Sequence, residues 1–292
     1  MSHSLTRQAS ARAVAFLFAL SLLVGSAAGA AEEPWQTLPP TPSLPKSVNS
    51  GFAPVNDIRM FYAVFGQGTP VLLLHGGLAN SNYWGYVIPI LVKRHYKVIV
   101  ADSRGHGRST RTEQPYSYDL MASDVIALLD YLKIKKVDLV GWSDGGIIGL
   151  DIAMHHPERL KRLFAYGANS DPTGLKPDID SSKNFNAYID RCRHEYVQLS
   201  PTPNDYEGFL QQIQAMWATQ PNWTKQQLQQ ISIRTAIADG AYDEAIKREH
   251  TEYLARTISH AELLILNDVS HFGMLQNPEE FSTAVLSSLK GR

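Results

Sequence analysis

The pattern of apolar and polar positions alternates between buried strands and helices over most of the chain. Short apolar runs are typical of strands that are covered on both faces. We expect such strands at 71–74, 97–101, 137–140, 160–166, 233–238 and 262–266. Segments with helical spacing lie near 82–92, from about 117, near 243–258 and from 278. With two further strands around 49–55 and 58–65, the alternation predicts an α/β protein whose mostly parallel sheet has helices on both faces and a site at the carboxyl ends of its strands.

The interval 170–232 breaks this alternation. It contains no convincing buried strand, but helical runs near 182–199 and 204–219 carry aromatic side chains among polar ones. We therefore predict a helical cap at 170–232, inserted between two parts of an α/β core at 48–169 and 233–292. In the alternative interpretation, these are ordinary helices whose aromatic residues are buried in the core.

The first 30 residues contain the three parts of a secretory signal peptide. Arg7 and Arg12 precede an apolar run at 13–24, and an Ala-x-Ala cleavage site ends at Ala30. The run has twelve residues, whereas a membrane-spanning helix needs roughly 20. We expect cleavage after Ala30, a periplasmic or secreted protein, and no stable membrane insertion afterwards. An uncleaved amphipathic anchor is the alternative.

Residues 31–47 include five prolines. Proline cannot donate a ladder hydrogen bond and favours an extended chain. This composition predicts a linker between the export signal and a domain that begins near Val48.

Composition and charge exclude several classes of protein. With 292 residues, of which 44% are apolar and 19% charged, the chain is long enough for one large globular domain. A net charge of -1 and the absence of lysine- or arginine-rich runs argue against nucleic-acid or anionic-membrane partners. The single cysteine, Cys192, cannot form an intrachain disulfide. No His-Glu-x-x-His or comparable ligand spacing predicts a metal site.

The chain changes from strand periodicity to helical periodicity at Ser143. The apolar run 137–140 precedes this serine, and apolar residues at helical spacing follow it. Gly141 and Gly145 flank it in the Gly-x-Ser-x-Gly arrangement, in which a side chain two residues from the serine would collide with the sharp turn. The pattern predicts a nucleophile elbow. A glycine-rich loop with an incidental serine is the alternative.

A serine nucleophile needs a base, and the base needs an acid that orients it. His271 directly follows the last predicted strand, on the same sheet edge as Ser143, and is our candidate base. Two acids compete after strand 233–238: Asp239 is closer to the strand end, and Asp243 lies in a Gly-x-x-Asp turn that can bring its carboxylate over the sheet. We choose Asp243 as the orienting acid and keep Asp239 as the alternate. A helix-capping role is the other interpretation of Asp243.

Acyl transfer also needs preorganised donors for an oxyanion. The backbone N–H of Asp144, the residue after the nucleophile, is one candidate. The backbone N–H of Gly77, at the end of a central strand, is the other.

Five motifs resemble, in order, those of the α/β-hydrolase superfamily. They are His75-Gly76-Gly77, the loop 102–109, the elbow 141–146, the turn 240–243 and Ser270-His271-Phe272. The resemblance covers about 48–292. It implies the α/β-hydrolase fold with an eight-stranded sheet and a lid, the triad Ser143, Asp243 and His271, and no cofactor. It also implies that the loop 102–109 is structural support near the site.

The elbow sequence Gly-Trp-Ser-Asp-Gly-Gly also resembles valacyclovir-hydrolase-like amino-acid ester hydrolases. That resemblance implies that Asp144 helps bind a substrate amine. In the alternative, its side chain points to solvent at the helix N-terminus, where a carboxylate is favoured.

Serine at the elbow favours acyl chemistry, because relatives that open epoxides or remove halides use an aspartate there. Our leading hypothesis is an exported carboxylesterase that acts on small esters through an acyl-enzyme on Ser143. Lactone or carbon-carbon bond hydrolysis by the same triad is the second hypothesis. A non-catalytic binding protein with an inherited triad is the third, from a different class.

Overall fold

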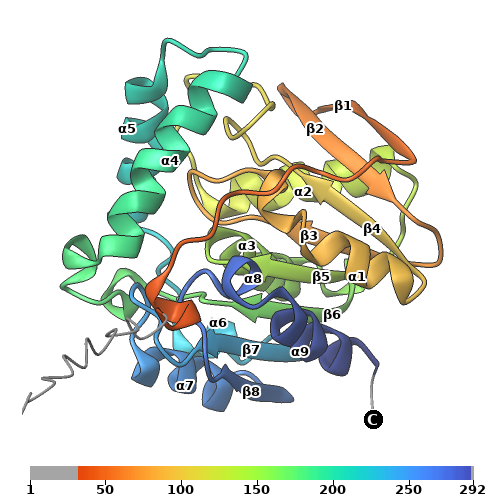
Figure 1. The fold of residues 1–292 in the computed structure, drawn as a ribbon. Coiled ribbons are helices and arrows are strands. Elements are labelled where there is room, and N and C mark those ends of the chain that lie inside the picture. The colour runs from red at the N-terminus through yellow and green to blue at the C-terminus, as the bar shows by residue number, and fades with distance from the viewer. Residues whose placement is uncertain (1–31, 291–292) are drawn as a thin grey trace, which may run out of the picture. The chain divides into compact units, whose positions relative to one another are not determined.

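An eight-stranded, mostly parallel sheet forms the core of the described chain (Figure 1). In the computed structural model, which describes residues 32–290, the strand order is β1-β2-β4-β3-β5-β6-β7-β8. The β1–β2 and β2–β4 pairs are antiparallel, and the other pairs are parallel. The strands are β1 (Asn49–Val55), β2 (Ile58–Phe65), β3 (Thr69–Leu74), β4 (Tyr96–Ala101), β5 (Val137–Trp142), β6 (Leu160–Tyr166), β7 (Arg234–Gly240) and β8 (Ala261–Leu266). The expected fold class is confirmed.

Helices cover both faces of this sheet (Figure 1). On one face α1 (Val87–Lys93) packs against α9 (Pro278–Lys290), and on the other α2 (Tyr118–Tyr131) packs against α3 (Asp144–His155). Helix α7 (Arg248–Thr257) packs against β7 and β8. Every residue of β5 is buried, which explains why the central strands appear in the sequence as continuous apolar runs.

Helix α7 begins at Arg248, later than the pattern near 243 suggests. The cause is the side chain of Asp243, whose Oδ1 accepts hydrogen bonds from the backbone N–H groups of Ala245 (2.6 Å) and Ile246 (2.7 Å). Such local bonds compete with helical ones and fold the segment into a turn.

The segment between β6 and β7 contributes the helices of the predicted cap. They are α4 (Lys183–Leu199), α5 (Tyr206–Trp217) and the short α6 (Lys225–Leu228). Phe185 and Trp217, on α4 and α5, line the same cavity as Ser143. These helices therefore cover the sheet edge at which β5 ends.

Residues 32–47, which we call the N-terminal strap, pass helix α4 with their first part and then run to β1 (Figure 1). Arg191 of α4 donates from Nη2 to the carbonyl oxygen of Leu38 (2.9 Å) and from Nη1 to that of Pro39 (2.6 Å). Leu38 and Leu44 pack against the main core. The sequence predicts an extended tether here, whereas in the structure the strap packs against the core.

The predicted signal peptide, residues 1–30, lies outside the residues that the structure describes. Within residues 32–290, no helix combines the length and apolar character needed to cross a bilayer. Export and cleavage stay predictions.

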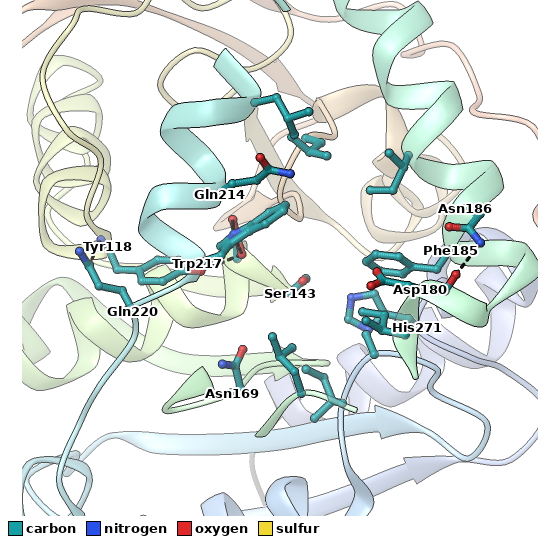
Figure 2. A pocket seen from close by; sticks show the side chains of 18 residues that line it. Tyr118, Ser143, Asn169, Asp180, Phe185, Asn186, Gln214, Trp217, Gln220 and His271 are labelled. Carbon is teal, nitrogen blue, oxygen red and sulfur yellow. Dashed lines mark hydrogen bonds between the residues drawn. The ribbon is translucent and has the colours of Figure 1, made fainter. Parts of the chain in front are cut away.

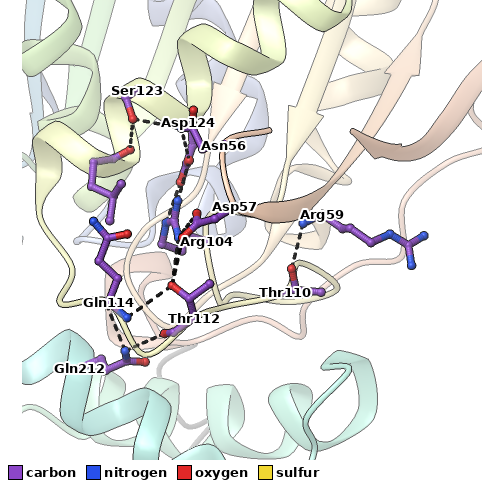
Figure 3. Close-up of polar contacts among 11 residues, drawn as sticks. Asn56, Asp57, Arg59, Arg104, Thr110, Thr112, Gln114, Ser123, Asp124 and Gln212 are labelled. Carbon is purple, nitrogen blue, oxygen red and sulfur yellow. Dashed lines mark hydrogen bonds and ion pairs between the residues drawn. The ribbon is translucent and has the colours of Figure 1, made fainter. Parts of the chain in front are cut away.

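A buried ion network joins the β1–β2 turn to helix α2 (Figure 3). Arg104 is fully buried, and it donates from Nε and Nη2 to the two carboxylate oxygens of Asp124, both at 2.8 Å. Its Nη1 lies 2.8 Å from Asp57 Oδ1. Asn56 Nδ2 also donates to Asp124 Oδ1 (2.7 Å). The loop that the resemblance assigned to structural support is thus fixed to two other segments of the core.

Replacing Arg104 with methionine is expected to destabilise the protein by about 3–5 kcal/mol, because it leaves the buried Asp124 without its cation. Urea unfolding measures this cost. Arg59→Met is the matched control, since Arg59 is exposed on β2 and a surface substitution usually changes stability by no more than about 0.5 kcal/mol. Equal stabilities of the two variants would contradict the prediction.

Candidate active site

Ser143 occupies the sharp turn between β5 and α3. Its backbone has φ 53° and ψ −121°, a strained conformation that costs a non-glycine residue about 1–3 kcal/mol. The turn is possible because of its two glycines. A Cβ at Gly141 would lie 2.2 Å from the carbonyl oxygen of Gly145, and a Cβ at Gly145 would lie 2.2 Å from that of Leu74. The strand-turn-helix context expected for the motif is present.

The loops after β7 and β8 bring His271 and Asp243 together. Nδ1 of His271 lies 2.6 Å from Asp243 Oδ2, and both side chains are buried. Burial opposes ionisation of Asp243, but the adjacent imidazolium outweighs it and lowers the pKa of the carboxyl to about 2. Burial also opposes protonation of His271, whereas the Asp243 carboxylate raises its pKa above the ordinary value. The pair has the geometry of a base with its orienting acid.

Asp239, the alternate acid, does not contact His271. Its Oδ2 accepts a hydrogen bond from Thr251 Oγ1 (2.6 Å), and its Oδ1 accepts one from the Gly240 N–H (2.9 Å). Burial, and then the nearby Asp243 carboxylate, raise the pKa of Asp239 far above its ordinary value. Of the two acids, only Asp243 therefore faces the histidine.

The residues that carry the predicted oxyanion donors lie next to Ser143. A Cβ at Gly76 would be 3.1 Å from the Cβ of Ser143, so the loop after β3 lies against the serine. Among residues 32–290, the N–H of Gly77 has no hydrogen-bond acceptor. The N–H of Asp144 belongs to the first residue of α3, where helical N–H groups lack intrahelical partners. Tyr188 of α4 donates a hydrogen bond to the carbonyl oxygen of Gly77, which fixes this loop from the cap.

The family model described as the alpha/beta hydrolase fold matches residues 69–191. The chain is 28% identical to 3-oxoadipate enol-lactonase 2 of Acinetobacter baylyi, over 80% of this chain and 94% of that protein. It is 24% identical to the serine hydrolase BPHL of Mus musculus, over 84% of this chain and 88% of that protein.

Among solved structures, the meta-cleavage product hydrolase CumD from Pseudomonas fluorescens IP01 matches with a TM-score of 0.71 and 22% identity, over 83% of this chain and 97% of that chain. This likeness supports the fold. The chain belongs to the α/β-hydrolase superfamily. The relatives named above are hydrolases, which supports the same general activity for this α/β-hydrolase.

A cavity of about 390 Å³ opens between the sheet edge and the cap of this α/β-hydrolase (Figure 2). Ser143 and His271 both line it. On one side of Ser143 the view shows Tyr118, Gln214 and Trp217, and on the other side it shows Phe185 with His271. Most of the remaining lining is aliphatic: Leu78, Leu175, Ile179, Ile189, Leu210 and Ile246. The cavity thus combines an aliphatic lining with polar groups on both sides of the serine, including Gln214 on one side and Asn186 on the other.

Ser143 Oγ and His271 Nε2 have no hydrogen-bond partner among residues 32–290. Nδ1 of the histidine is engaged by Asp243, so Nε2 is the nitrogen available to the cavity. Hydrogen bonds of catalytic groups are often long before substrate binds and tighten in the complex.

The side chain of Asp144 points into the protein, contrary to the solvent-exposed alternative. Only 5% of the residue is exposed. Tyr118 donates to its Oδ1 (2.9 Å), and Trp217 Nε1 lies 3.1 Å and 3.0 Å from its two oxygens. Burial raises the pKa of this carboxyl to about 6, against the effect of both donors. Asp144 also lines the cavity that contains Ser143.

Sequence reasoning did not find Tyr118 and Trp217 as partners of this carboxylate. Tyr118 begins α2 and Trp217 ends α5, and no spacing along the chain connects them. The one available indication was chemical, since a buried tryptophan or tyrosine normally finds an acceptor for its N–H or O–H.

One group of side chains in the described part of the chain has the spacing of a metal site. Asp119, Asp151 and His155 offer ligand atoms within 4.8 Å of one another. None of them lines the cavity of Ser143, so they are separate from the candidate active site.

Proposed function

We propose that this protein is an exported serine hydrolase that cleaves small carboxylic esters through an acyl-enzyme on Ser143. The observation that carries the proposal is the His271–Asp243 pair, whose histidine lines the same cavity as Ser143. Export rests on the sequence of residues 1–30 alone.

The proposed reaction assigns each step to a group of this site. Ser143 Oγ attacks the ester carbonyl while His271 Nε2 takes the hydroxyl proton, and Asp243 stabilises the imidazolium that forms. The backbone N–H groups of Gly77 and Asp144 hold the oxyanion. The imidazolium then protonates the departing alcohol, and a water molecule, deprotonated by His271, releases the acid and restores Ser143.

Hydrolysis of a lactone or of a carbon-carbon bond is the second candidate. It is favoured by relatives whose names describe an enol-lactonase and a meta-cleavage product hydrolase. The same nucleophile, base and oxyanion donors serve both reactions, so the bond that is cleaved depends on the substrate that the cap admits.

Labelling with a fluorophosphonate separates an enzyme from a binding protein. We expect an adduct on Ser143 in the folded protein and none after unfolding, because only the folded chain supplies the base. Ser170 is an internal control, since its Oγ lies 3.2 Å from His250 Nε2 but the residue is fully buried. No adduct on Ser143 would favour the non-catalytic alternative.

A substrate panel then separates the two enzymatic candidates. Rates on p-nitrophenyl esters of increasing chain length, on lactones and on meta-cleavage products would be compared. A kcat/KM for lactones or carbon-carbon substrates far above that for every ester would replace the ester assignment.

Asp144→Asn tests whether this residue selects substrates with an amine. If the carboxylate binds an ammonium group, the wild-type protein should prefer an aminoacyl ester over its uncharged analogue by about tenfold, since hydrogen bonds to charged groups contribute about 1.5–3 kcal/mol. The variant should lose the preference while keeping its backbone N–H. Because ionised Asp144 is required and its pKa is about 6, the preference should be present above pH 6 and decline below it. Equal substrate ratios in both proteins would remove Asp144 from substrate selection.

A further inference from the structure

The N-terminal strap contacts the loop that carries Asp243. The indole ring of Trp35 stacks on Tyr242, with ring centroids 4.2 Å apart and planes inclined by 9°. Tyr242 directly precedes Asp243, and its N–H donates to the carbonyl oxygen of Val269 (3.1 Å), just before His271. Tyr242 is 46% exposed, so the core covers it only in part and the strap supplies its aromatic partner.

The strap also contacts the loop that carries His271. Gln276, at the end of α8 (Gly273–Gln276), donates from Nε2 to the carbonyl oxygen of Thr37 (2.8 Å) and to Ser270 Oγ (2.9 Å). Its Oε1 accepts the N–H of Ser270 (2.7 Å). One glutamine side chain therefore joins the strap backbone to the residue that precedes His271.

The two loops are joined to each other at Glu244. Its Oε2 accepts the N–H of His271 (2.9 Å), and its Oε1 accepts Ser270 Oγ (3.2 Å). The cap enters the same network, because Asn184 of α4 donates to the carbonyl oxygen of Trp35 (2.9 Å). Asn184 and Trp35 thus connect the cap to the loops on either side of the histidine–aspartate bond.

We propose that Trp35 is a positioning residue, through which the strap holds the Asp243 and His271 loops in the alignment that catalysis needs. The bond between His271 and Asp243 joins two loops that follow different strands, so its length depends on how these loops are held. A misplacement of about 1 Å in an active site can cost about 100-fold in rate. This inference rests on the proposed function of the pair, and it adds a segment that is remote from the cavity in sequence.

Trp35→Ala, made in the full chain, tests the inference. We expect kcat for p-nitrophenyl acetate to fall about 10- to 100-fold, with a much smaller change in KM, because the cavity wall is untouched. Trp35→Phe keeps an aromatic ring on Tyr242 and should restore most of kcat. Leu44→Ala is the matched control, since Leu44 is a core contact of the same strap nine residues after Trp35.

A second readout does not depend on hydrolysis. The proton NMR resonance of His271 Nδ1–H and the pKa of the ring report the bond with Asp243 directly. In Trp35→Ala the resonance should broaden or shift and the pKa should fall toward the ordinary value, while Leu44→Ala leaves both unchanged. If the wild-type protein hydrolyses no ester but Trp35→Ala still changes the His271 resonance, the proposed function is refuted and the positioning role of the strap is retained.

Unchanged kcat and an unchanged His271 resonance in folded Trp35→Ala would overturn the inference. An equal loss of kcat in Leu44→Ala would also overturn it, because the loss would then reflect a general destabilisation of the strap and not the contact of Trp35. If Trp35→Ala does not fold, Tyr242→Leu provides a second test, because it removes the other ring of the same stack. It should change kcat and the His271 resonance in the same way.

Discussion

Replacing Ser143 with alanine should reduce kcat for p-nitrophenyl acetate by about 10⁶-fold, the loss typical of a serine nucleophile whose base is left intact. Among the described residues that line the cavity, Tyr118 is the only other one with a hydroxyl, and that hydroxyl already donates to the Asp144 side chain. The residual rate should come from oxyanion stabilisation and substrate binding alone. Steady-state kinetics on purified protein, with the fluorophosphonate adduct absent, measure the effect.

The variant should remain folded. Alanine keeps the Cβ of serine and loses a hydroxyl that makes no hydrogen bond with the described residues. Thermal unfolding should therefore change little, and substrate binding should persist. Retention of more than about one percent of the wild-type kcat would exclude Ser143 as the nucleophile, because loss of one oxyanion donor alone already costs about 100- to 1,000-fold.

Asp243→Asn should lower kcat by about 10⁴-fold, because an amide donates a hydrogen bond to Nδ1 and favours the wrong tautomer of His271. The loss of negative charge also changes the pH dependence. In the wild type the raised pKa of His271 places the acid limb of kcat/KM above the ordinary value of 6.5, since the ring must be neutral to accept the serine proton. In the variant this limb should move to lower pH.

Asp239→Asn is the matched control for this prediction. Burial and then the Asp243 charge raise the pKa of Asp239 far above its ordinary value, so an uncharged amide is a mild replacement. Its oxygen can accept the Gly240 N–H, and its NH2 group can donate to the hydroxyl oxygen of Thr251. We expect kcat to change by less than about tenfold, because no charge that faces the histidine is removed. A larger loss in Asp239→Asn than in Asp243→Asn would reverse the assignment of the two acids.

The sequence alone could not establish which of these two acids contacts His271. Asp239 lies at the end of β7 and Asp243 just after it, four positions later, so both reach the same edge of the sheet. The turn bonds from Ala245 and Ile246 to Asp243 orient its second oxygen toward His271. The sequence shows the Gly-x-x-Asp turn but not the position of an imidazole that arrives from 28 residues further along the chain.

The direction of the Asp144 side chain could not be predicted from the sequence either. A carboxylate at a helix N-terminus is favoured in solvent, so exposure and a role in the cavity were equally consistent with its position in the sequence. Packing of α5 over the sheet edge decides between them, because it delivers the indole N–H of Trp217 to both carboxylate oxygens.

The amino-acid sequence alone determined the sheet, the elbow at Ser143 and the two loops that follow β7 and β8, because periodicity and glycine sterics act over a few residues. Only the tertiary structure decided which acid meets His271, that Asp144 is buried against the cap, and that residues 32–47 pack on the domain beside the Asp243 and His271 loops. These outcomes depend on contacts between segments far apart in the chain. Their free energies come from the burial and hydrogen bonding of several segments at once, which no local pattern records.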